Sequence, residues 1–109
     1  MNKEWKDKWV AALRSGEYKQ GIEALRYTSY APKNLSEEVK AYCCLGVLCD
    51  LVAKEYPDQF YWEDDIFHFK KDGRVYEESY VLPGAVVDIV GEPPIFPQTL
   101  MIYNDNYRY

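Results

Sequence analysis

The chain has 109 residues, which is enough for one domain with its own hydrophobic core and too few for two. Apolar residues make up 48% and charged residues 28%, a balance that excludes a disordered tail. The net charge of -5 argues against duplex DNA or RNA as the main partner, because proteins that bind the phosphate backbone carry a basic face. No stretch approaches the roughly 20 apolar residues that cross a bilayer. The charged N-terminal residues lack the apolar core of a signal peptide, so we expect a cytoplasmic protein.

The first predicted element is a helix over residues 3–14. Asn2 is a suitable N-cap, since its side chain can accept a hydrogen bond from the first turn. Gly16 stands where helices commonly stop. The apolar side chains recur at helical spacing and form one stripe, which consists of Trp5, Trp9, Ala12 and Leu13. The two tryptophans, one turn apart, indicate anchors of a hydrophobic core.

Residues 17–30 leave two interpretations open, a short helical turn around Ile22–Leu25 or the edge of a strand. A loop is expected over residues 31–34. A second helix is predicted from about residue 36 to residue 55, with Ser36 as its N-cap and Pro57 beyond its end. Valines in this segment also permit a strand, but its length favours a helix.

The middle of this predicted helix, Cys43–Val52, is apolar almost all round, which is typical of a buried helix. Gly46 costs about 1 kcal/mol of helix propensity relative to alanine. We therefore expect another element to cross closely at Gly46. The three cysteines, Cys43, Cys44 and Cys49, are expected to be reduced and buried as small apolar residues.

Residues 59–81 are predicted to form a β-hairpin. Its turn is Asp72-Gly73, a strong two-residue hairpin signal, and its first arm runs from Phe60 to Phe69. Alternation along that arm places His68 on the side of Asp64 and away from Glu63. A short helix follows over 83–90, with Gly91 after it, and its expected inward stripe comprises Leu82, Val86, Ile89 and Val90.

Together these elements predict an α+β fold within a single domain, residues 1–109. A small antiparallel sheet, the hairpin of about 59–81, is expected to pack on the buried central helix. The N-terminal helix and the short helix near 83–90 complete the arrangement.

Catalytic signals are weak. His68 is the only histidine, and pairing it with a cysteine would require that cysteine to leave the core. A metal site built from Asp64, His68 and a remote acid is one interpretation of the acidic run 63–65, and a solvated acidic strand is the other. Glycine-rich phosphate loops are absent from the sequence. We expect no cofactor, no metal and no catalytic residues.

Tyrosine is the outlier in composition, since it occurs 11 times. Its flat apolar ring and hydroxyl suit interfaces and stacking pockets, although a half-buried sheet also uses tyrosine. The polar, aromatic C-terminal segment could read a nucleobase and a phosphate, or it could be a frayed terminus. The candidate ligand-binding residues are Tyr61, Trp62, His68, Arg74, Tyr76, Tyr103, Asn104, Asp105 and Arg108.

Two segments of the sequence carry a resemblance to known proteins. They are KWVAALRSGEYKQG at residues 8–21 and YCCLGVLCD at residues 42–50. They resemble a large group of short phage and prophage proteins. Members often continue with a Leu-Pro…Val segment ending in glycine, like residues 82–91, and with a stretch similar to residues 100–105. The resemblance implies a phage context, in which small accessory proteins without catalytic signatures are often counter-defence factors.

Three functions follow from these expectations. The first is a homo-oligomeric protein that sequesters a small nucleotide-derived immune signal in the host cytoplasm without cleaving it. The second is an inhibitor that binds a host defence protein directly. The third is a small nucleotide hydrolase that uses Asp64, Asp65 and His68.

Overall fold

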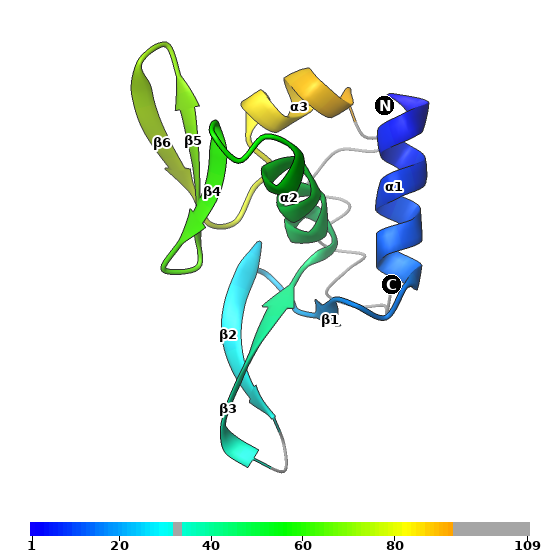
Figure 1. Cartoon of the computed structure of the whole chain (residues 1–109), viewed down its shortest axis with the longest axis vertical. Coiled ribbons are helices and arrows are strands. Elements are labelled where there is room, and N and C mark those ends of the chain that lie inside the picture. The colour runs from blue at the N-terminus through cyan, green and yellow to red at the C-terminus, as the bar shows by residue number, and fades with distance from the viewer. Residues whose placement is uncertain (32–33, 93–109) are drawn as a thin grey trace.

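A computed structural model describes residues 1–31 and 34–92 (Figure 1). Helix α2, Cys44–Glu55, lies at the centre of this part, between the two sheets and the other helices. The remaining elements are α1 (Lys3–Arg14), β1 (Lys19–Gln20), β2 (Arg26–Ala31), β3 (Asn34–Tyr42), β4 (Phe60–Glu63), β5 (Ile66–Lys71), β6 (Arg74–Glu78) and α3 (Gly84–Val90). The described residues thus confirm the predicted α+β class, with three helices and two small sheets.

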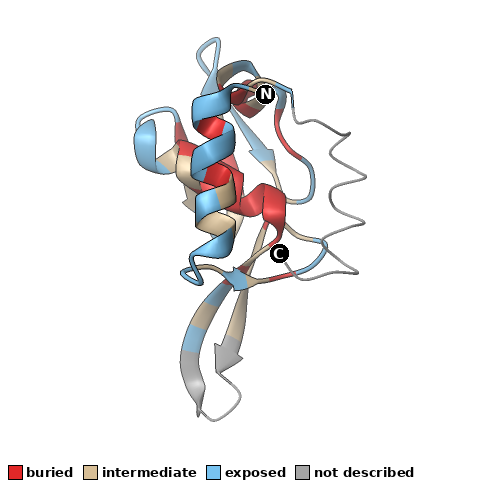
Figure 2. Cartoon of the chain, turned by 90° about the vertical axis from the view of Figure 1, so that its right-hand side faces the viewer, coloured by how far each residue is buried: buried red, intermediate tan, exposed pale blue. Residues whose placement is uncertain are grey.

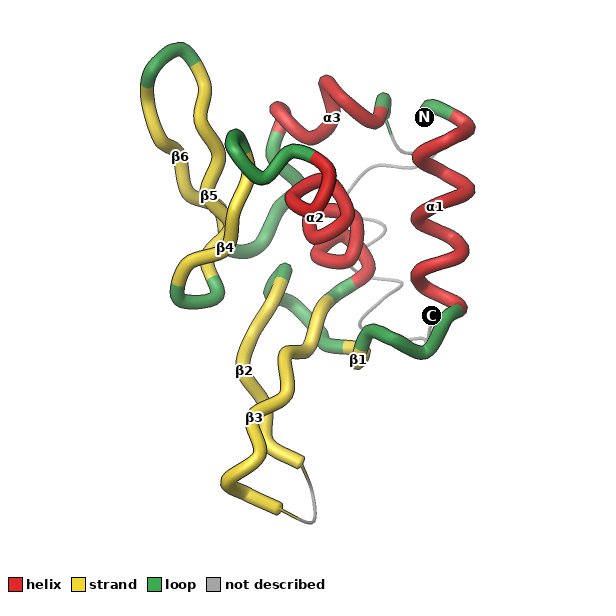
Figure 3. The backbone as a smooth tube through the Cα atoms, viewed as in Figure 1, coloured by secondary structure: helices red, strands yellow, loops and turns green. Residues whose placement is uncertain are grey.

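Two separate three-stranded sheets flank α2. In the first, β3 lies between β1, with which it is parallel, and β2, with which it is antiparallel. In the second, β4, β5 and β6 follow one another as an antiparallel meander. The β2–β3 hairpin projects away from the helices, as the tube view makes clear (Figure 3).

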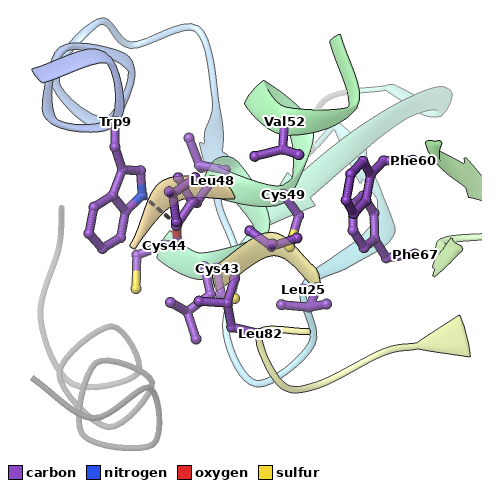
Figure 4. Close-up of a cluster of buried hydrophobic side chains, with 14 of the residues drawn as sticks. Trp9, Leu25, Cys43, Cys44, Leu48, Cys49, Val52, Phe60, Phe67 and Leu82 are labelled. Atoms are coloured by element: carbon purple, nitrogen blue, oxygen red, sulfur yellow. Dashed lines mark hydrogen bonds between the residues drawn. The ribbon is translucent and has the colours of Figure 1, made fainter. Parts of the chain in front are cut away.

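Helix α1 is capped and anchored as its sequence predicts. The Asn2 side chain accepts a hydrogen bond from the backbone N–H of Glu4 at 2.9 Å. Trp5 and Trp9 are both buried. The indole N–H of Trp9 donates to the carbonyl oxygen of Cys44 at 2.8 Å, which joins α1 to the first turn of α2 (Figure 4).

The close approach expected at Gly46 is present. A Cβ atom there would overlap the carbonyl oxygen of Leu25, a fully buried residue from the segment before β2. The same carbonyl accepts a hydrogen bond from the N–H of Cys43 at 3.3 Å. The chain therefore crosses the start of α2 at a distance that only glycine permits. The three cysteine side chains are buried in the surrounding core, as predicted (Figure 4).

The prediction of one helix over 36–55 is wrong in its first part, because residues up to Tyr42 form strand β3. Exposed Glu38 and Lys40 alternate there with half-buried Val39 and buried Ala41, which is the two-residue period of a strand. Pairing with both β1 and β2 satisfies the backbone of this segment. Tertiary hydrogen bonding thus outweighs the weak local signal for a helix start.

The ambiguity over residues 17–30 is settled in favour of strands, which are the short β1 at Lys19–Gln20 and β2 from Arg26 onward. Ile22–Leu25 form neither the helical turn nor a strand edge. Ile22 is 49% exposed, whereas Leu25 is fully buried and its N–H donates to the Ser79 carbonyl at 2.8 Å. The expected loop over 31–34 is shorter than predicted, and residues 32–33 lie outside the described part.

The predicted hairpin over 59–81 has the correct turn at Asp72-Gly73 but one strand too few. Asp64 and Asp65 adopt φ values of 52° and 62°, so they form a second turn inside the expected first arm. Aspartate tolerates this left-handed region better than most residues. The result is a three-stranded meander, in which the predicted alternation across Asp64 no longer applies.

Helix α3 confirms the short helix expected near 83–90. Its residues Val86 and Val90 are fully buried, Leu82 before it is buried, and Ile89 is half-buried. The Val90 carbonyl accepts a hydrogen bond from the N–H of Asn2 at 2.8 Å, so the end of α3 holds the start of α1. Buried residues from these elements gather on α2 (Figure 2). Within the described residues, each helix is too short or too polar to cross a membrane.

Candidate functional site

Five of the nine candidate ligand-binding residues lie in the β4–β6 sheet. The strand register divides them between its two faces, with Tyr61 and His68 on the outer face and Trp62 and Tyr76 on the inner face toward α2. Arg74 shares the inner face with Tyr76, two residues away. The other four, Tyr103, Asn104, Asp105 and Arg108, lie outside the described residues. The described candidates therefore form two groups rather than one.

On the outer face, the rings of Tyr61 and His68 stack with their centroids 5.0 Å apart and 9° between their planes. His68 is only 7% exposed. Its Nε2 atom lies 3.5 Å from a carboxylate oxygen of Glu77 and 3.8 Å from one of Glu63. Nδ1 lies 3.0 Å from the Ile66 carbonyl, to which it donates in the tautomer protonated there. The expected separation of His68 from Glu63 is thus wrong, because the turn at 64–65 brings β4 back beside β5.

On the inner face, aromatic rings form a continuous stack that reaches the surface at Tyr76. The Phe60 ring stacks on Phe67 at 5.8 Å and on Phe69 at 6.4 Å between centroids. Phe69 in turn stacks on Tyr76 at 5.5 Å. Phe60 and Phe67 are fully buried, whereas Tyr76 is 41% exposed. The core therefore holds the Tyr76 ring from one side and leaves part of it open to solvent.

Two cations share this face with Tyr76. Arg74 lies two residues before it on β6, and Lys71 is the cross-strand partner of Arg74 on β5. Both side chains are exposed. Across the two described ranges, neither cation has a carboxylate partner. We name Lys71, Arg74 and Tyr76 the hairpin-tip surface.

Trp62 belongs to a different cluster, which is centred on the buried carboxylate of Asp50. The indole N–H of Trp62 donates to Asp50 Oδ1 at 3.1 Å, and the Tyr18 hydroxyl donates to Oδ2 at 2.6 Å. Lys54 Nζ lies 3.3 Å from the same Oδ2. The Tyr42 ring packs edge-on against both Tyr18 and Trp62. The cluster thus supplies the buried Asp50 carboxylate with two hydrogen-bond donors and one positive charge.

The environment of Asp50 changes the acidity of the neighbouring phenols. Burial, followed by the hydrogen bond to Asp50, raises the pKa of Tyr18 to about 12. Burial also raises the pKa of Tyr42, and the nearby negative charge of Asp50 adds to that effect. Both hydroxyls therefore stay neutral at physiological pH, where the Tyr18 hydroxyl acts as a hydrogen-bond donor.

Asp65 joins the two sheets through three donors. It accepts hydrogen bonds from Arg26 Nε at 2.9 Å, Thr28 Oγ1 at 2.6 Å and Lys40 Nζ at 3.0 Å. Burial alone would raise the pKa of Asp65, but these hydrogen bonds and the two positive charges outweigh it and lower the pKa. The Arg26 guanidinium also lies over the Trp62 ring, 4.5 Å from its centroid.

The sequence analysis predicted neither the Asp50 cluster nor the Asp65 cluster, although one feature of the sequence indicated the first. Asp50 is the only charged residue in the apolar run 43–52, and a buried carboxylate requires donors. Which donors supply it depends on the tertiary fold, since Tyr18 and Trp62 are 32 and 12 residues away along the chain.

The arrangement does not support the hydrolase built from Asp64, Asp65 and His68. Within the described residues, His68 faces Glu63 and Glu77, whereas Asp65 is bound by Arg26 and its neighbours. Burial raises the pKa of the Cys49 thiol well above its usual value, which disfavours the nucleophilic thiolate. Over the same two ranges, 1–31 and 34–92, groups of three acidic, histidine or cysteine side chains suitable for a metal ion do not occur.

Comparison with known proteins gives one match. No curated protein and no solved structure matches the chain. A family model described as a domain of unknown function, DUF8296, matches residues 1–102. Because this match spans nearly the whole chain, the protein belongs to the DUF8296 family.

Proposed function

We propose that this protein is a phage accessory protein that binds and sequesters a small nucleotide-derived immune signal without cleaving it. The observation that supports this proposal most is the hairpin-tip surface. It combines a partly exposed ring, fixed from behind by the core, with two cations that lack a carboxylate partner among the described residues.

The chemistry of this surface suits a nucleotide. A base can stack on the open part of Tyr76, an interaction worth about 1–3 kcal/mol per base. Arg74 offers a planar guanidinium for bidentate contacts to phosphate, and Lys71 adds a second positive charge. Because Phe69 already holds the Tyr76 ring, binding costs little side-chain ordering.

The net charge of -5 restricts the ligand to a small one. A long polyanion would meet repulsion from the rest of the surface, whereas a short ligand contacts only the local cations. Over the described residues, the geometry places no nucleophile, metal cluster or histidine on the hairpin-tip surface. We therefore propose that the bound ligand is retained and is not hydrolysed.

Isothermal titration calorimetry against cyclic oligonucleotides and ADP-ribose-type molecules tests the proposal. We expect at least one of them to bind with a Kd of about a micromolar or tighter. Tyr76→Ala should weaken that binding by at least about tenfold, and Arg74→Gln by a similar factor. Tyr56→Ala is the matched control, since Tyr56 is also 41% exposed but lies at the end of α2. Binding that is absent throughout the panel would contradict the proposal.

A second candidate function is direct inhibition of a host protein. Large apolar side chains are exposed along β6 and the segment after it, namely Val75, Tyr76, Tyr80 and Val81. Such a surface, rich in tyrosine, suits a protein interface, and the acidic net charge would steer the protein toward a basic partner. A pull-down from bacterial lysate should then recover a host protein in stoichiometric amount, with the recovery lost in Tyr80→Ser. Recovery of no such protein would count against this function.

A further inference from the structure

Strand β6 is the outermost strand of its sheet and has a partner on one side only. Within the described residues it pairs with β5 alone (Figure 1). The first four of its five side chains are exposed, and Val75 reaches 53%. An edge of this kind carries backbone groups that can pair with another strand.

The ladder fixes which backbone groups of β6 point outward. The N–H of Lys70 donates to the Gln59 carbonyl at 2.9 Å, so the polar backbone groups of Lys70 point toward β4. Since directions alternate along a strand, those of Phe69 point toward β6, and those of its partner Tyr76 point back toward β5. The N–H and C=O groups of Val75 and Glu77 therefore point away from the sheet.

The sequence of this edge is complementary to itself. When two copies run antiparallel with Tyr76 on the two-fold axis, Arg74 of each copy lies directly opposite Glu78 of the other. The outward-pointing Val75 then faces Glu77 of the second copy, in the geometry in which opposed residues exchange two hydrogen bonds. We propose that two copies of this chain pair through β6 in this register and form one six-stranded sheet.

Neighbouring registers bring like charges together. Centring the pairing on Val75 brings Asp72, in the turn before β6, close to Glu78 of the second copy. Centring it on Glu77 sets that residue opposite itself. Like charges directly opposite destabilise a strand pair, whereas opposite charges stabilise it. Backbone direction allows all three registers, since each sets outward-pointing groups against one another. The central register is favoured by charge, and it alone pairs all five residues of β6 with the second copy.

The pairing requires no ligand, so it goes beyond the proposed function and does not depend on it. It would bring the two Tyr76 rings together at the axis, with Arg74 and Lys71 of both copies on the same face of the continuous sheet. A guanidinium has five N–H donors, so Arg74 can contact both Glu78 of the second copy and an anionic ligand. The contact is short, and we expect a weak dimer, with a Kd on the order of 100 µM.

Sedimentation velocity on the full chain, from about 10 µM to about 1 mM, tests the pairing. We expect a monomer that converts to a dimer over this range. Val75→Pro removes only an outward N–H, which a β-edge tolerates, and should weaken the dimer by at least about tenfold while the far-ultraviolet circular dichroism is unchanged. Tyr76→Pro is the contrasting variant, since it removes an N–H that bonds to β5 and should disrupt the meander itself.

A charge-swap cycle tests the register without altering the backbone. Arg74→Glu and Glu78→Arg should each weaken the dimer by about tenfold, and the double variant should regain most of the loss. Arg14→Glu on α1 makes the same change of charge elsewhere and should leave the dimer intact. A wild-type chain that stays monomeric at about 1 mM, or a dimer that survives both Val75→Pro and Arg74→Glu, would overturn the pairing. The first result would also leave this edge open to a different polypeptide.

Discussion

Replacing Gly46 with alanine should destabilise the protein by about 3 kcal/mol, although alanine is the better helix former by about 1 kcal/mol. The reason is the crossing of the Leu25 segment over α2. The new methyl group would overlap the Leu25 carbonyl oxygen and would lie 2.6 Å from its carbonyl carbon. These are backbone atoms, so a change of side-chain rotamer does not relieve the overlap.

The magnitude follows from what must move. Displacing Leu25 weakens two hydrogen bonds, from Cys43 N–H to its carbonyl and from its own N–H to Ser79. Each is worth about 1 kcal/mol, and overpacking in a core costs about 1–3 kcal/mol more. Subtracting the gain in helix propensity leaves about 2–4 kcal/mol, which is a large share of the stability of a small domain.

Urea unfolding followed by tryptophan fluorescence measures this loss, with Gly84→Ala as the matched control. Gly84 begins α3, and a Cβ atom there would meet no other atom within 4 Å. The control should be neutral or slightly stabilising. A Gly46→Ala variant as stable as the wild type would refute the packing described for α2.

The other predictions concern titration and reactivity. Because the folded state lowers the pKa of Asp65, the ionised carboxylate stabilises the fold fully above its usual pKa of 3.8, and this stabilisation is lost as the pH falls through the lower folded value. In urea unfolding, the difference in stability between wild type and Asp65→Asn should therefore be largest near neutral pH and should disappear in acid. The pKa of Tyr18 is raised, so the pH dependence is reversed: the neutral phenol stabilises the fold fully below the usual pKa of 10.0, and this stabilisation is lost as the pH rises through about 12. An absorbance titration of Tyr18→Phe should therefore lack one tyrosine that ionises late in the wild type. Loss of a tyrosine that ionises early would be inconsistent with the Asp50 cluster. Cys49 is fully buried with a raised pKa, so a thiol reagent should label it only at the rate of unfolding; rapid labelling of the folded chain would show that the core is open.

The sequence was most informative where local signals and tertiary packing agree. The Asn2 cap and the Trp5–Trp9 stripe specify α1, and Asp72-Gly73 specifies the turn between β5 and β6. Each of these signals acts within a few residues. The close crossing at Gly46 could also be predicted, because a glycine inside an apolar helix costs helix propensity and commonly marks the close approach of another backbone.

The errors arose where distant partners decide the structure. Strand β3 has a helix-like start, and only its pairing with β1 and β2 makes it a strand. The turn at Asp64-Asp65 lacks glycine and proline, so nothing marked it strongly. Missing that turn placed His68 on the wrong side of Glu63 and concealed the role of Asp65 between the two sheets.

The phage context and the nucleotide-type ligand rest on a resemblance and on the hairpin-tip surface together. The surface by itself supports binding of a small anion with an aromatic part.

Equilibrium dialysis of the wild-type chain against the nucleotide panel, with chromatography of the ligand released afterwards by heat, tests the central claim most directly. The account predicts that at least one nucleotide is retained in a fixed stoichiometry, is recovered chemically intact, and is no longer retained by Tyr76→Ala. A panel in which no nucleotide is retained, or a bound nucleotide that is recovered as a cleaved product, would contradict it.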